Sequence, residues 1–114
     1  MISLLPNRSE RIKQKVLSGD YDTTKAGYLK TWTAGVWGTD YIECYYIVKG
    51  IKYTRSIKSH YYYNRCQHTP QNCVGIRFWA IYLKDEPRNC IIDLSNEIQD
   101  IKEPKFPATL NNFE

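Results

Sequence analysis

The stretch Val74-Gly-Ile-Arg-Phe-Trp-Ala-Ile-Tyr-Leu83 is the densest apolar run in the chain and has the composition of a β-strand. Its large side chains alternate between two faces, with Phe78, Ala80 and Tyr82 on one and Trp79, Ile81 and Leu83 on the other. A strand that is apolar on both faces lies between two layers or closes a small barrel. We therefore expect the remaining elements to be arranged around a strand at residues 75–83.

Other segments with strand-like alternation lie at residues 28–34, 41–49, 52–58 and 90–94. Lys49-Gly50 separates two of them and predicts a tight hairpin, because Gly supplies the positive φ that such turns need. Ahead of the strands, Asn7 can cap a helix over residues 8–18, and residues 19–22 read as a turn. This order predicts a mostly β protein, a small antiparallel five-stranded sandwich or barrel with one N-terminal helix packed on it.

The shared alternation of three strands also predicts which side chains form the core. We expect Ile12 and Val16 of the helix to cover that core, and we expect these residues to be buried together: Ile42, Cys44, Tyr46, Val48, Phe78, Ala80, Tyr82 and Ile92. Residues 1–94 then form a single β domain. Residues 95–114 are expected to be an extended acidic tail, with one helical turn near Glu97–Ile101.

The net charge of +4 is unevenly distributed along the chain. Residues 1–84 contain 13 Lys/Arg and 5 Asp/Glu, whereas residues 85–114 contain 3 and 7. This asymmetry is typical of a basic body covered by an acidic tail, or of a basic surface for an anionic partner.

Met1–Leu5 is too short for the apolar part of a signal peptide, and no run approaches a membrane span. A cytoplasmic location, or one peripheral to a membrane, is expected, with the membrane itself a partner only if a helix precedes Met1.

Four motifs follow one another along the chain: the hairpin at 45–56, the strand Val74–Leu83, Asp85-Glu-Pro87 and Cys90-Ile-Ile-Asp-Leu94. Together they resemble the small bacterial β domains of the DUF3592-like group, which is common in Bacteroidetes. The chain departs from the group at Ile76, where Lys is usual, and in lacking the membrane helix that often accompanies such domains. The group has no established function, so the resemblance implies a fold and no catalytic residue.

Residues 59–73 are expected to form a long polar loop, and such loops are often functional. His60, Cys66, His68 and Cys73 are together a complete ligand set for tetrahedral zinc, although their spacing matches no known finger. A Cys66–Cys73 disulfide and four unrelated side chains are the alternatives. Because no secretion signal is visible, we expect two free thiols and no metal.

Tyr61, Tyr62 and Tyr63 in the same loop offer a second kind of site, a stacking platform for bases or sugars. The cations Arg55, Lys58 and Arg65 are candidates for phosphate contacts. Alternatively, the tyrosines continue the preceding strand and pack in the core.

The sequence carries no nucleophile elbow and no phosphate-binding glycine loop. We therefore expect a non-enzymatic binding or scaffolding module without a cofactor, associated with the bacterial cell envelope, with a protein as its partner. The alternative is a nucleic-acid-binding β-barrel that uses the Tyr-rich loop and the basic surface.

Overall fold

The computed structural model describes residues 8–36, 38–98 and 110–114 and contains one five-stranded antiparallel sheet. The spatial order of the strands is β3-β2-β1-β4-β5. In chain order the elements are α1 (Arg8–Leu17), β1 (Tyr21–Ala34), β2 (Thr39–Val48), β3 (Ile51–Lys58), α2 (His60–His68), the 3-10 turn η1 (Pro70–Asn72), β4 (Arg77–Leu83), β5 (Cys90–Glu97) and a second 3-10 turn, η2 (Leu110–Asn112). The mostly β class and the N-terminal helix are confirmed, whereas α2 was not expected.

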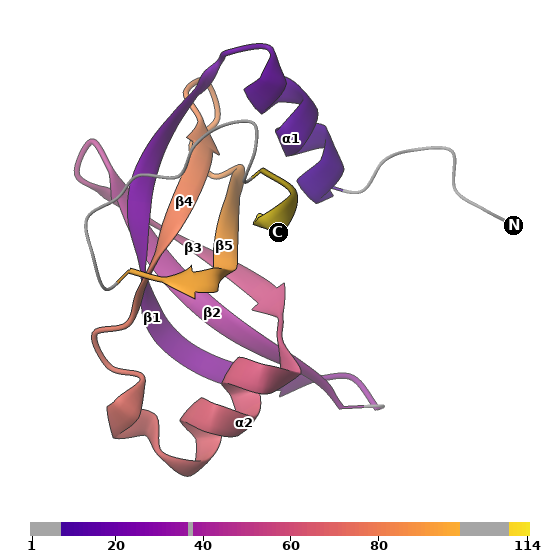
Figure 1. The fold of residues 1–114 in the computed structure, drawn as a ribbon, viewed down its shortest axis with the longest axis vertical. Coiled ribbons are helices and arrows are strands. Elements are labelled where there is room, and N and C mark those ends of the chain that lie inside the picture. The colour runs from indigo at the N-terminus through magenta and orange to yellow at the C-terminus, as the bar shows by residue number, and fades with distance from the viewer. Residues whose placement is uncertain (1–7, 37, 99–109) are drawn as a thin grey trace, which may run out of the picture.

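The long strand β1 holds the sheet together by pairing with two different neighbours (Figure 1). Its first half, Tyr21 to Gly27, pairs with β4, and its second half, from Gly27 onward, pairs with β2. A register shift between Tyr28 and Lys30 marks a β-bulge, which bends a strand. The expected start at residue 28 is therefore wrong, and the turn expected over residues 19–22 is shorter, because pairing with β4 extends the strand back to Tyr21.

The β2–β3 hairpin is confirmed by its register, in which Val48 pairs with Ile51. Lys49 and Gly50 both adopt positive φ, 51° and 80°, as a two-residue hairpin turn requires. Because the side-chain period of a strand is two residues, this register places Ile42, Cys44 and Tyr46 on one face of β2.

The inner face of the curved sheet encloses the larger apolar core. All the residues expected there are buried together, except that Tyr82 is half-buried against the cluster. Helix α2 closes this core at one end, where the Tyr62 ring meets the edge of the Phe78 ring at a centroid distance of 5.3 Å. The segment expected to be a loop thus supplies a helix that covers the interior.

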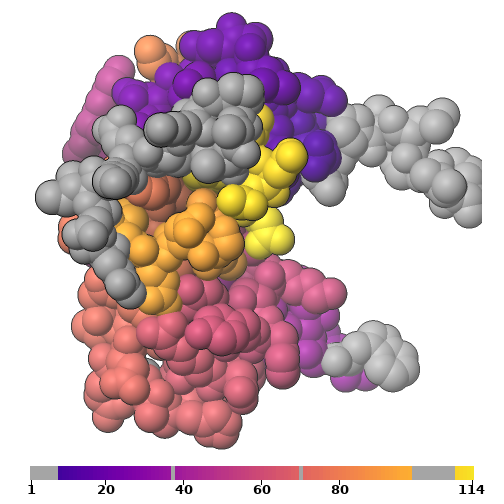
Figure 2. All heavy atoms as spheres, viewed as in Figure 1, coloured from indigo at the N-terminus to yellow at the C-terminus, as the bar shows by residue number. Residues whose placement is uncertain are grey.

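A second apolar cluster lies on the opposite, outer face of β4 and β5. Ile12 and Val16 of α1 pack there against Trp79, Ile81 and Ile91. Residues 110–114 complete the cover, lying beside α1 over β5 (Figure 2). The expectation that α1 covers the Phe78 core is therefore wrong. The apolar side chains of α1 pack instead on the outer side of β4 and β5.

The strands closest to the C-terminus also differ from their expected bounds. β4 begins at Arg77 rather than at residue 75, and β5 continues to Glu97 instead of ending at residue 94. Phe113 forms an antiparallel bridge with Asp93, and Ile92 and Glu114 exchange two backbone hydrogen bonds. Glu97, where a helical turn was expected, is the last residue of β5. The rest of that expected turn, from residue 99, lies outside the described residues.

Neither α-helix in the described part of the chain has the length and apolar character needed to cross a membrane.

Candidate functional site

The outer face of β1, β2 and β3 carries aromatic and basic side chains that no described element covers. The two-residue alternation of the paired strands places these residues on it: Lys30, Trp32, Tyr41, Glu43, Tyr45, Lys52, Ser56 and Lys58. We call this set the aromatic face. It is the continuation of the sheet surface that α1 covers on β4 and β5.

Two rings at one end of the aromatic face are stacked on each other. Trp32 and Tyr41 are directly paired across β1 and β2, and their ring centroids are 4.5 Å apart with an interplanar angle of 15°. The Trp32 indole Nε1 donates to Ser56 Oγ at 3.1 Å, and the Ser56 hydroxyl donates to Glu43 Oε1 at 3.1 Å. The hydrogen bond fixes the Trp32 ring, and the Tyr41 ring stacks on it, so both half-exposed rings have a defined orientation.

A third ring, Tyr45, lies against the backbone of β1 at Gly27. A Cβ added at Gly27 would meet Cε1 of the Tyr45 ring at 2.8 Å, so only glycine allows this close approach. The Lys52 ammonium lies 5.0 Å from the centroid of the Tyr45 ring, in a cation–π contact. The aromatic face thus combines flat rings with a cation held above one of them.

The charge on the aromatic face is predominantly positive. Lys30, Lys52 and Lys58 are exposed on it, and Glu43 is its single carboxylate. Exposed ammonium groups beside half-exposed rings can contact the phosphates and bases of an extended polyanion together. Chemically, the face can bind and orient a ligand by stacking and by charge.

The three tyrosines proposed as a stacking platform point in different directions, because they lie on consecutive positions of helix α2. Ser59 caps this helix by accepting a hydrogen bond from the backbone N–H of Tyr62 at 3.2 Å. Tyr62 is buried and donates its hydroxyl to Glu97 Oε1 at 2.8 Å. Tyr61 is exposed and Tyr63 is half-buried.

The cations proposed as phosphate contacts are also separated. Arg65 forms an ion pair with Glu97 on β5 and lies over the Tyr62 ring. Arg55 extends from the inner side of β3 toward α1, where its Nη2 donates to Ser9 Oγ at 3.0 Å. Lys58 alone lies on the aromatic face, so the structure does not bring the six proposed binding residues together.

The cysteines of the segment 59–73 form a disulfide, Cys66–Cys73, with a Cα–Cα distance of 5.7 Å. The expectation of two free thiols is therefore wrong. Helix α2 and the following turn bring the two residues together, and this approach is not apparent in a segment interpreted as a loop. The set proposed for zinc is not assembled, because His60 Nδ1 instead pairs with Asp40 Oδ2 at 2.8 Å. No group of three metal-binding side chains occurs in the described residues.

The other two cysteines, Cys44 and Cys90, are free and buried. Burial raises the pKa of each thiol to about 12. The protonated thiol is therefore the form present near neutral pH, and it is a poor nucleophile.

Sequence reasoning missed the aromatic face although its signal was present. Tyr41, Glu43 and Tyr45 alternate along β2, and Lys52, Ser56 and Lys58 alternate along β3. What the sequence did not indicate was the pairing of Trp32 with Tyr41, or which side of the sheet α1 would cover.

In comparisons with known proteins, no protein family, no curated protein and no solved structure matches this chain.

Proposed function

We propose that this protein is a non-enzymatic binding module that takes an extended ligand across the aromatic face. The observation that carries this proposal is the set of three ordered, partly exposed rings on a sheet face that no described element covers. An uncovered face of this kind is a typical docking surface. The side chains with potential chemistry support a binding role, since Cys44 and Cys90 are buried and protonated.

Single-stranded nucleic acid is the ligand class that the aromatic face fits best. Stacking of bases on Trp or Tyr and contacts of phosphates with Lys are the usual means of binding such strands. The strand order, with a helix between the third and fourth strands, is also that of the five-stranded Greek-key barrels known as OB-folds. OB-folds bind oligonucleotides and oligosaccharides over strands 2 and 3. This second argument is an analogy of topology and supports the first without replacing it.

A second candidate is a protein-binding module of the cell envelope, as the resemblance to DUF3592-like domains suggests. The disulfide Cys66–Cys73 favours it, because structural disulfides persist mainly in oxidising compartments. The same aromatic face would then meet a protein partner.

Titration with oligothymidylate of roughly twelve nucleotides, followed by amide NMR, tests the proposal. We expect shifts confined to β1, β2 and β3 at low salt, and an affinity that falls steeply as salt is raised. Trp32→Ala and Tyr45→Ala should each weaken binding by about 1–3 kcal/mol. Tyr61→Ala is the matched control, because Tyr61 is an exposed tyrosine on α2 outside the aromatic face. If no amide shifts at low salt, nucleic acid is not the ligand and the protein-binding candidate takes its place.

A further inference from the structure

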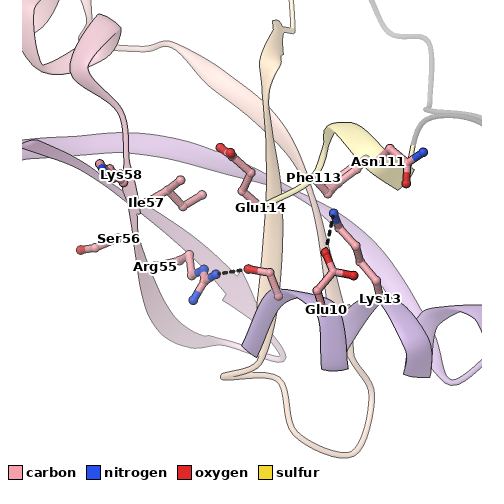
Figure 3. A pocket seen from close by; sticks show the side chains of 10 residues that line it. Glu10, Lys13, Arg55, Ser56, Ile57, Lys58, Asn111, Phe113 and Glu114 are labelled. Carbon is pink, nitrogen blue, oxygen red and sulfur yellow. Dashed lines mark hydrogen bonds and ion pairs between the residues drawn. The ribbon is translucent and has the colours of Figure 1, made fainter. Parts of the chain in front are cut away.

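A pocket of about 370 Å³ opens between α1, β3 and the C-terminal residues, on the side of β3 away from β2 (Figure 3). The first turns of α1 form one wall, β3 from Arg55 to Lys58 forms another, and Phe113 and Glu114 form a third. Three segments far apart in the sequence therefore surround one space. It shares Ser56 and Lys58 with the aromatic face, and its other lining residues lie outside that face.

The guanidinium of Arg55 is the unusual group in this pocket. Arg55 pairs with Cys44 in the β2–β3 ladder, so it projects from the inner side of the sheet. Its Nη2 donates to Ser9 Oγ, but its Nε is fully buried and has no hydrogen-bond partner in the described residues. A buried donor without an acceptor is costly and rare in native structures.

The charges around Arg55 further destabilise its buried, positively charged guanidinium. Burial lowers the pKa of Arg55, and the nearby cation Arg8 lowers it further. Lys13 and Lys58 also line the pocket, and of its two carboxylates Glu10 is paired with Lys13 at 3.8 Å. Glu114 favours the charged form of Arg55, although the two form no ion pair within 4.0 Å. The pocket therefore has an excess of positive charge, and its central cation lacks a direct counter-charge.

We propose that this pocket binds a phosphate monoester, whose oxygens accept hydrogen bonds from the Arg55 guanidinium. An arginine edge matches the spacing of two phosphate oxygens, and charge-assisted hydrogen bonds of this type are strong. The first turn of α1 adds the positive end of a helix dipole. Because Glu10 already pairs with Lys13, the cations left to the ligand are Arg55 and Lys58, and a dianion offsets two cations where a single carboxylate offsets one. The volume lies in the usual range for small-ligand sites, so it also admits the group that the phosphate is attached to.

Amide NMR titration in a phosphate-free buffer tests the proposal with four compounds: inorganic phosphate, adenosine 5′-monophosphate, adenosine and acetate. We expect the nucleotide and inorganic phosphate to shift the amides of Ser9 and Ser56, with the nucleotide binding more tightly. Adenosine and acetate should produce no shifts there. Equal responses to acetate and to phosphate would overturn the assignment to phosphate, and so would a response to adenosine alone.

Variants separate the role of Arg55 from a general effect of charge. Arg55→Gln should weaken nucleotide binding by about tenfold or more, because it removes the charged donor. Arg77→Gln removes an exposed arginine outside the pocket and is the matched control. If Arg55→Gln fails to fold, Lys58→Gln serves instead, because it alters an exposed side chain and should weaken binding by a few-fold.

Although the pocket and the aromatic face share Ser56 and Lys58, Trp32 lies outside the pocket and distinguishes the two proposals. Trp32→Ala should leave phosphate binding unchanged, whereas it should weaken oligothymidylate binding. Unchanged nucleotide affinity in both Arg55→Gln and Lys58→Gln would show that the pocket is not the phosphate site.

Discussion

The outer surface of the sheet is divided into two regions that differ in what lies over them. Over β4 and β5, aliphatic side chains such as Ile81 and Ile91 are fully buried beneath α1. Over β1, β2 and β3, the side chains are rings with polar atoms, lysines and a carboxylate, and they remain partly exposed. Both regions contain a tryptophan, but Trp79 is buried with Lys25 above it whereas Trp32 is half-exposed and donates to Ser56. The comparison shows that the covered and uncovered regions differ in composition: the mainly aliphatic region lies beneath a helix, and the region of amphipathic rings and lysines, with Ile47 beside them, remains partly exposed.

The largest effect is expected from a matched pair of isoleucines in the two regions. Ile81→Ala should lower the free energy of unfolding by about 2–5 kcal/mol, because Ile81 is 0% exposed and its loss leaves a cavity. Ile47→Ala, on the uncovered strands, should change it by no more than about 0.5 kcal/mol, since Ile47 is 54% exposed. Urea denaturation measures both. Equal losses of unfolding free energy in the two variants would mean that the two regions are packed alike.

Removing the disulfide should affect the interior and leave both outer regions unchanged. Cys66→Ser with Cys73→Ser should lower stability by about 2–3 kcal/mol, because the seven-residue separation closes a short loop in the unfolded chain. Amide exchange should increase in α2 but not in α1. Increased exchange in α1 would show that the inner and outer clusters do not open independently.

The two buried thiols of the interior predict that stability falls at alkaline pH. The folded pKa of Cys44 and Cys90 is raised to about 12, above the reference value of 9.0. Each thiol therefore contributes stability that is fully present below pH 9 and is lost as the pH rises toward 12. The slope approaches about 1.4 kcal/mol per pH unit for each group. Urea denaturation from pH 8 to 11 should show this loss, and Cys44→Ala should reduce the slope.

A small effect is expected at Gly27, beneath the aromatic face. An added Cβ at this position conflicts with the tip of the Tyr45 ring, which can move into solvent because nothing described covers it. Gly27→Ala should therefore cost about 1 kcal/mol or less, whereas overpacking a closed core costs about 1–3 kcal/mol. The same variant should weaken oligothymidylate binding, because it displaces Tyr45. A cost near 3 kcal/mol would indicate that the ring is confined and that the face is not open.

The elements that could be predicted from the sequence are those with strong local signals. The helix at Arg8–Leu17, the hairpin at Lys49-Gly50 and the inner face of Phe78 follow from capping, positive φ and alternation. The first half of β1 was missed because Tyr21–Lys25 has little apolar character and is ordered by β4, about sixty residues away. The candidate sites were missed for the same reason, because they depend on contacts between separate segments of the chain. The Trp32–Tyr41 stack and the environment of Arg55 depend on pairings and packing that no local pattern contains.

The division of β1 between two partners has a consequence for the order of folding. Its second half joins the β2–β3 hairpin through contacts that are short in sequence, such as Ala34 with Thr39. Its first half pairs with β4 through contacts such as Tyr21 with Leu83, which require closure of a long loop. Contacts of large sequence separation slow folding. A three-stranded meander of β1, β2 and β3 is therefore expected to form before β4 arrives, with Gly27 as the point where the early and late halves of one strand meet.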